Sequence, residues 1–164
     1  MTPKYHVVAS VTISGILFLI FRSWGLAIAS FISGIFIDLD HVIDYVFEHG
    51  LHLDVKKFFH FFYGEQYKKL TLVFHGWEWL VVLLIISWQT GWNPWVTGLT
   101  IGWSQHMLFD RLYNVCTFGS YSLWWRFKNG FDATKFVLRN RNKAEKYNHR
   151  SSFCGYETGR ESEE

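Results

Sequence analysis

The chain has 164 residues, of which 49% are hydrophobic, 20% aromatic and 18% charged, with two Pro and two Cys. This composition excludes a disordered chain, a collagen-like repeat and a disulfide-rich module, and the length suits one domain. The net charge of +2 is too small to indicate nucleic-acid binding, so no nucleic-acid partner is expected.

Charged residues are strongly segregated along the chain. Between residues 5 and 37 the one charged residue is Arg22, and between residues 70 and 109 it is Glu78. Uncharged apolar runs predict membrane spans, and turns near Arg22 and Gly91 divide these two runs into helices at residues 6–21, 23–37, 72–88 and 94–109. Each run is shorter than the usual span of ~20 residues, which leaves a buried soluble helical hairpin as the alternative.

Three local features favour the membrane and define the helix ends. Tryptophans of the kind that form aromatic belts occur at the ends of the runs, at Trp24, Trp88, Trp92 and Trp95. Ser30 and Gly34 lie four residues apart, which predicts close helix contact, and Pro94 suits a first helical turn. The predicted fold is all-α: a polytopic membrane protein with a four-helix up-and-down transmembrane bundle.

The distribution of basic residues predicts the orientation. Tight turns place Arg22 on one side of the membrane and the other 15 of the 16 Lys and Arg on the opposite side. The positive-inside rule makes that opposite side cytoplasmic, so we expect a multi-pass protein of the plasma membrane (the bacterial inner membrane) with both termini in the cytoplasm. Membrane lipids are the expected partners, and the sequence leaves the oligomeric state open.

The expected domain organisation follows from the same pattern. Residues 1–113 form the four-span membrane domain, residues 114–154 a basic and aromatic interfacial helical tail, and residues 155–164 a disordered terminus. Residues 56–62 in the long loop predict a further interfacial helix. For the tail, a solvated helix packed on the bundle is the alternative.

Histidines and carboxylates gather at one end of the predicted bundle. In an up-and-down bundle the starts of odd spans and the ends of even spans share one face, so side chains from four helices converge there. Imidazole and carboxylate are the usual ligands of Zn, Mn and Fe, and bundles build metal sites from such residues on facing helices. We predict a divalent metal site, with Zn as the expected metal and Mn or Fe as alternatives, whose ligands are His6, Asp38, Asp40, His41, His75, His106 and Asp110.

Several of these residues also admit simpler roles. His6 suits a helix start, and Asp110 beside Arg111 suits a solvated ion pair. Glu78 lies inside an apolar span, where an ionisable group is a functional hypothesis by default. Asp44, one turn after Asp40, is expected to hold a ligating histidine by its other ring nitrogen.

The same residues carry a resemblance to a known family. The series His6, Asp38-Leu-Asp40-His41, His75 and His106-x-x-x-Asp110 resembles the YdjM-like membrane-bound metal-dependent hydrolases, which are themselves similar to zinc-dependent phospholipase C and P1-type nucleases. The match covers roughly residues 6–110, with Ile37 where the family has Pro and Phe74-His75-Gly76 where it has Thr-His-Ser. The resemblance implies hydrolysis of a phosphoester, such as a phospholipid headgroup.

Three functions therefore remain open at this stage. The first is a metal-dependent hydrolase at the cytoplasmic membrane face, in which a metal activates water and Glu78 or Asp38 is the catalytic general base. The second is a metal carrier or sensor, although Arg22 is the one ionisable residue near the far end of the predicted spans. The third is a structural membrane protein whose polar cluster is a hydrogen-bond network.

Overall fold

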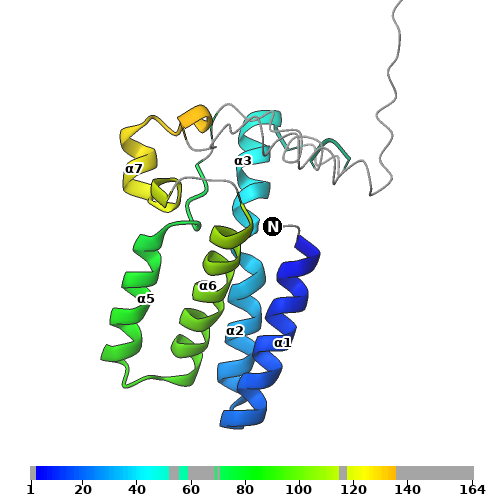
Figure 1. The fold of residues 1–164 in the computed structure, drawn as a ribbon, viewed down its shortest axis with the longest axis vertical. Coiled ribbons are helices and arrows are strands. Elements are labelled where there is room, and N and C mark those ends of the chain that lie inside the picture. The colour runs from blue at the N-terminus through cyan, green and yellow to red at the C-terminus, as the bar shows by residue number, and fades with distance from the viewer. Residues whose placement is uncertain (1–2, 52–55, 59–68, 70, 115–117, 136–164) are drawn as a thin grey trace, which may run out of the picture.

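The computed structural model describes residues 3–51, 56–58, 69, 71–114 and 118–135, and this part of the chain is helical (Figure 1). Its helices are α1 (Pro3–Phe21), α2 (Trp24–Phe36), α3 (Leu39–His49), α5 (Trp77–Gln89), α6 (Pro94–Tyr113) and α7 (Leu123–Lys128), with 3-10 helices at Phe118–Tyr121 and Ala133–Lys135. The predicted all-α class is confirmed for these residues. The expected terminus at 155–164, most of the tail helix and most of the loop helix at 56–62 lie outside the described residues.

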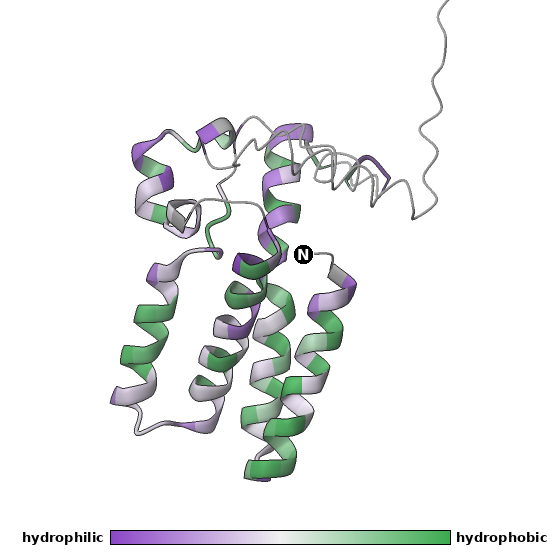
Figure 2. Ribbon diagram, in the orientation of Figure 1, coloured by the Kyte–Doolittle hydropathy of each residue, from purple (hydrophilic) through white to green (hydrophobic). Residues whose placement is uncertain are grey.

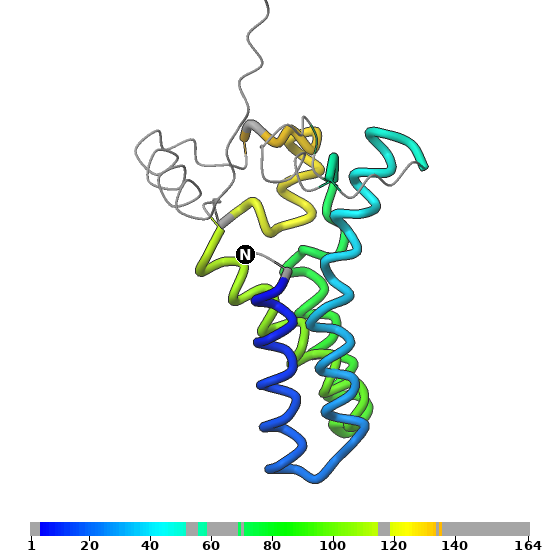
Figure 3. The backbone as a smooth tube through the Cα atoms, turned by 90° about the vertical axis from the view of Figure 1, so that its right-hand side faces the viewer, coloured from blue at the N-terminus to red at the C-terminus, as the bar shows by residue number. Residues whose placement is uncertain are grey.

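The helices α1, α2, α5 and α6 run up and down in alternation, as predicted (Figures 1 and 3). The central pair is α2 and α6, with α1 packed against both of them and α5 packed against α6. The turns at residues 22–23 and 90–93 lie at one end of the bundle. The start of α1, the junction between α2 and α3 and the last turn of α6 lie at the other end, which brings distant parts of the sequence to one level.

Local chemistry explains where most of these helices begin and end. Arg22 adopts a positive φ of 51°, and the Ser23 side chain accepts a hydrogen bond from the Leu26 N–H at 3.3 Å, which caps α2. Pro94 is the first residue of α6, as predicted, and Asn93 accepts from the Trp95 N–H at 3.0 Å. These ends agree closely with the turns expected from the sequence.

One helix boundary was predicted wrongly. The third span was expected from residue 72, but α5 begins at Trp77. Residues 71–75 form a non-helical segment because carboxylates of α3, described below, accept hydrogen bonds from its N–H groups. Apolar character alone does not distinguish such a buried segment from the first turn of a helix.

Small residues allow the central helices to approach closely. A Cβ atom added at Gly102 would collide with the Ser30 carbonyl oxygen and the Ser33 hydroxyl, and one added at Gly98 would collide with the Leu26 carbonyl oxygen. One added at Gly34 would collide with side chains from α1 and α6. The contact predicted from the Ser30–Gly34 spacing is therefore confirmed, and it is completed by an equivalent glycine pair on α6.

The bundle is polar inside and apolar outside. Its buried side chains include Ser10, Ser14, Ser30, Ser33, Ser87, Thr100 and Gln105. Large exposed side chains of α1, α2, α5 and α6 are mainly Val, Ile, Leu, Phe and Trp, and apolar residues cover the lower helices in Figure 2. In α5 the one buried residue is Ser87. A water-soluble bundle fills its core with apolar side chains, whereas in this bundle polar side chains share the interior with Leu26, Ala27, Ala29 and Met107.

Two stretches of the described residues are long and apolar enough to cross a membrane, Lys4–Phe21 and Trp24–His49. The second stretch joins α2 to α3. The helix α5 is apolar but has 13 residues, and α6 has 20 residues but contains several polar ones. The four predicted spans therefore meet the criterion of length and composition only in the first two.

Candidate metal centre

The structure brings the predicted ligands together at one end of the bundle. His6 lies on the first turns of α1, Asp38 at the start of α3 and His41 on α3, while His106 and Asp110 lie on the last turns of α6. His75 was expected in the first turn of a span but lies in the segment before α5. Convergence from several helices, which was deduced from topology, is confirmed.

Two groups of these residues have the arrangement of metal ligands. One group is His6, His106 and Asp110, and the other is Asp38, His41 and His75. Within each group the potential ligand atoms all lie within 4.8 Å of one another. The buried His and Asp groups can therefore hold a metal ion, as predicted.

The two groups adjoin through carboxylate oxygens. Asp38 Oδ1 lies 3.4 Å from His106 Nε2 and 3.8 Å from His75 Nε2. Asp110 Oδ2 lies 3.5 Å from His75 Nε2 and 3.7 Å from His106 Nε2, while Asp110 Oδ1 is 3.0 Å from His6 Nε2. Donor atoms held ~2.0–2.2 Å from a common Zn²⁺ in a tetrahedron lie roughly 3.3–3.6 Å apart, so these separations suit a shared ion.

The protonation of two histidines follows from their partners. His106 Nδ1 is 2.8 Å from the Gly34 carbonyl oxygen, which only accepts hydrogen bonds, so Nδ1 is the donor. His75 Nδ1 is 3.3 Å from the Asp40 carboxylate, and the same reasoning makes it a donor. Both Nε2 atoms then face the cluster, and neither has a hydrogen-bond partner among the described residues. Burial lowers the pKa of His75, but the carboxylates of Asp110, Asp40 and Asp38 outweigh burial and raise that pKa to about 9.

The two Nε2 atoms face carboxylate oxygens inside a buried site. His75 is 1% exposed and His106 is 0% exposed. The adjoining carboxylates of Asp38 and Asp110 repel each other, and burying charge without a compensating partner costs free energy. A cation between them removes both penalties, and the bonds at Nδ1 are those that orient histidine ligands in metal proteins. The residues present therefore fit a divalent metal.

Asp40 occupies a different place from the one predicted. It was predicted as a metal ligand, but it belongs to neither ligand group, and its Oδ2 atom is engaged by the segment that carries His75. That atom accepts hydrogen bonds from the Phe74 N–H and from the His75 N–H at 3.1 Å, and it also faces His75 Nδ1. Asp40 therefore orients a ligand, which is the role that the sequence assigned to Asp44.

Asp44 and Glu78 bind backbone groups elsewhere. Asp44 Oδ2 accepts from the N–H groups of Thr71 and Leu72 at 2.8 and 3.1 Å, so it does not hold a histidine ring. Glu78 accepts from the Ser122 hydroxyl at 2.6 Å and from the first N–H groups of α7. The predicted general base is therefore a cap for a short helix, because both of its oxygens are engaged there.

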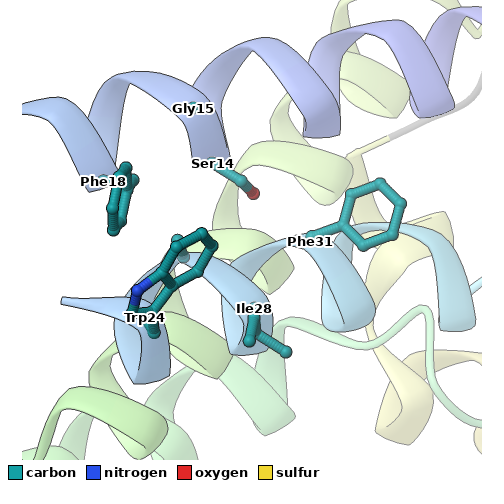
Figure 4. Close-up of a pocket in the computed structure, with 7 residues that line it drawn as sticks. Ser14, Gly15, Phe18, Trp24, Ile28 and Phe31 are labelled. Carbon is teal, nitrogen blue, oxygen red and sulfur yellow. The ribbon is translucent and has the colours of Figure 1, made fainter.

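One side of the centre faces solvent. The side chains of Asp38 and His41 are 25% and 30% exposed, whereas those of His6, His75 and Asp110 are 5% exposed or less. A substrate would therefore approach beside Asp38 and His41. An open apolar groove of about 260 Å³ lies farther along α1 and α2, lined in part by Ser14, Phe18 and Trp24, and it does not include the metal ligands (Figure 4).

Sequence reasoning missed two contributors. The Gly34 carbonyl oxygen orients His106. A pattern of side chains in the sequence does not predict which backbone carbonyl will accept a hydrogen bond. Arg126 on α7 donates to the carbonyl oxygen of His75 at 2.7 Å, although it lies in the tail that was treated as interfacial. Arg126 and His75 are more than fifty residues apart in the sequence, so no helical spacing relates them and the contact could not be predicted.

Comparison with protein-family models, with curated proteins and with solved structures finds no match to this chain. The resemblance to YdjM-like hydrolases therefore rests on the order and spacing of the motif residues alone.

Proposed function

We propose that this protein is a membrane-embedded, metal-dependent hydrolase that acts on a phosphoester, with a phospholipid headgroup as the favoured substrate. The observation that carries the proposal is the pair of buried Nε2 atoms, of His75 and His106, that face the carboxylates of Asp38 and Asp110 without a hydrogen-bond partner among the described residues. The two adjoining ligand groups support binding of one or two divalent ions, with Zn²⁺ favoured by the imidazole and carboxylate donors.

A divalent metal would supply an activated water and would polarise the phosphoryl group under attack. The protein residues perform the other tasks. Asp38 combines exposure with proximity to the histidine cluster, so its carboxylate is placed to accept the proton of an attacking water. Asp40 and the Gly34 carbonyl oxygen hold the rings of His75 and His106 at Nδ1, so that their Nε2 atoms are aimed inward.

The membrane location draws on the distribution of apolar surface. Within Lys4–Phe21 only 17% of the residues are buried, unlike in the core helix of a soluble protein, whereas 44% of the apolar stretch in Trp24–His49 is buried. Monomeric soluble proteins rarely expose apolar patches of more than a few hundred Å². We propose four spans, with α5 and α6 crossing beside α2, both termini in the cytoplasm and the metal centre at headgroup depth.

Metal content is the first test of this function. Detergent-purified wild-type protein is expected to contain one or two equivalents of Zn, Mn or Fe by elemental analysis. The double variant His106→Ala/Asp110→Ala is expected to lose this metal, because it removes two of the three members of one ligand group and the Asp110 oxygen that lies beside His75 of the other. A matched control is His49→Ala, which alters an exposed histidine at the end of α3, outside both ligand groups.

The outcomes of the metal test are distinct. Metal present in wild type and in the His49 variant but absent from the double variant supports the centre. Absence of metal from all three, even after reconstitution with Zn²⁺, Mn²⁺ or Fe²⁺, would eliminate the hydrolase and leave the polar cluster as a structural network.

Membrane insertion is tested by fractionation. We expect the protein to remain in the membrane pellet after an alkaline carbonate wash and to be released by detergent, because its exposed apolar helices need lipid or detergent around them. A peripheral membrane protein carried through the same wash is the control. Release of the chain into the carbonate supernatant would contradict the proposed spans.

A further inference from the structure

A buried arginine lies beside the proposed centre without belonging to it. The side chain of Arg126 is 1% exposed, and charged side chains are almost never buried unless they are paired. Its Nη1 donates to the Thr71 carbonyl oxygen at 3.0 Å and its Nη2 donates to the His75 carbonyl oxygen at 2.7 Å. Arg126 thus binds both ends of the segment that presents the His75 ring.

This segment is bound from the opposite side by two carboxylates. Asp44 accepts from the N–H groups at residues 71 and 72, and Asp40 accepts from those at residues 74 and 75. The carboxylates satisfy donors, whereas the guanidinium satisfies acceptors. A short non-helical segment is therefore held between α3 and α7 by charge-assisted hydrogen bonds, which are stronger than neutral ones.

The position of α7 is itself fixed at the start of α5. Glu78 accepts from the Leu123 N–H at 3.0 Å and from the Trp124 N–H at 3.1 Å. Burial lowers the pKa of the Arg126 guanidinium from its ordinary value, and the carboxylates of Asp40, Glu78 and Asp44 oppose this shift. The helix that carries Arg126 is therefore held in place by Glu78, and the nearby carboxylates favour the charged form of the guanidinium.

We propose that Arg126 is a positioning residue for the metal centre, acting by fixing the His75 backbone so that Nε2 faces Asp38 and Asp110. The inference rests on the proposed function, because it assigns Arg126 a role toward the ligand set. Residues that orient a ligand typically change metal affinity by about 10- to 100-fold when they are replaced. A lysine at this position has one compact ammonium group and no planar guanidinium. It would therefore reproduce only part of the hydrogen bonding to the Thr71 and His75 carbonyl oxygens.

Metal affinity of the full-length protein tests the proposal without any assay of activity. Zn²⁺ is titrated in competition with a chelator, and Co²⁺ is used to record the visible spectrum of the site. Arg126→Gln is expected to weaken Zn²⁺ binding by about 10- to 100-fold and to alter the Co²⁺ spectrum, with Arg126→Lys intermediate. The control Lys128→Gln removes the same charge from an exposed position on the same helix and is expected to match wild type.

The sign of the effect separates positioning from simple electrostatics. Removing a positive charge near a cation site strengthens cation binding by Coulomb attraction alone, whereas loss of positioning weakens it. Unchanged or tighter Zn²⁺ binding by Arg126→Gln, with an unchanged Co²⁺ spectrum, would overturn the proposal while leaving the hydrolase intact. If Arg126→Gln does not fold, Arg126→Lys is decisive: wild-type affinity and spectrum in that variant overturn the proposal. Failure of the wild-type protein to bind metal would overturn the proposed function, and this inference with it.

Discussion

Replacing Asp38 with Asn is expected to reduce phosphodiester hydrolysis by about 10²- to 10⁴-fold, the usual contribution of a general base. Asp38 is partly exposed and its Oδ1 atom lies 3.4 Å from His106 Nε2, so its carboxylate can reach both the ligand set and an incoming substrate. Asparagine preserves the shape and one oxygen but does not accept a proton. Turnover is measured with bis-p-nitrophenyl phosphate and with phospholipid vesicles, using protein whose metal content has been determined.

Glu78→Gln is the matched control for this experiment, because Glu78 was the rival candidate for the same role. Its carboxylate binds Ser122 and the first turn of α7, so the amide retains one accepting oxygen there. We expect hydrolysis by this variant to stay within about tenfold of wild type, well short of the loss of a general base. The reverse ranking, with Glu78→Gln inactive and Asp38→Asn active, would return the catalytic role to Glu78.

The bundle could be predicted from the sequence because its signals are local. Apolar runs, the turn at Arg22 and the proline at Pro94 define helix ends within a few residues, and alternation of direction then places the ends of different helices together. The convergence of His6, His75 and His106 could be predicted without knowing any contact between them. It followed from the end of the predicted span at which each residue lies.

The separate roles of the three aspartates on one short stretch depended on helix phase. Asp38 and His41 are three residues apart and share the face toward the ligands, whereas Asp40 and Asp44 are four apart and share the face toward residues 71–75. The spacing was visible in the sequence, but the sequence did not indicate which face met the histidines. The prediction therefore placed Asp40 beside Asp38 among the ligands and gave the orienting role to Asp44, whereas Asp40 lies outside both ligand groups and binds His75.

Contacts that span long stretches of chain left no such signal. The partners of Glu78 lie 44 to 46 residues away, in a tail whose composition suggested either an interfacial helix or a helix packed on the bundle. In the structure α7 binds the His75 segment through Arg126, and Glu78 caps α7. Glu78 was predicted to be functional because it lies in an apolar run, but local patterns did not place the helix that it caps.

Gly102→Ala is expected to destabilise the bundle by about 1–3 kcal/mol, the range found when extra atoms are forced into a packed core. The added Cβ would collide with the Ser30 carbonyl oxygen, and a backbone atom moves only if α2 and α6 separate. Separation also shifts Gly34, and with it the carbonyl oxygen that orients His106. The measurement is thermal unfolding of the metal-free and the Zn²⁺-loaded protein in detergent.

Gly15→Ala provides the matched control, because a Cβ at Gly15 has nothing within 4 Å. Gly15 lies on α1 at the edge of the open groove in Figure 4, so the same substitution adds the same methyl group without a collision. Alanine is the better helix former by roughly 0.5–1 kcal/mol, so this variant should be as stable as wild type or slightly more stable. Equal stability of the Gly102 and Gly15 variants would mean that α2 and α6 are not packed as closely as described. The orientation of His106 by the Gly34 carbonyl oxygen would then lose its structural basis, since that contact needs the same close approach of the two helices.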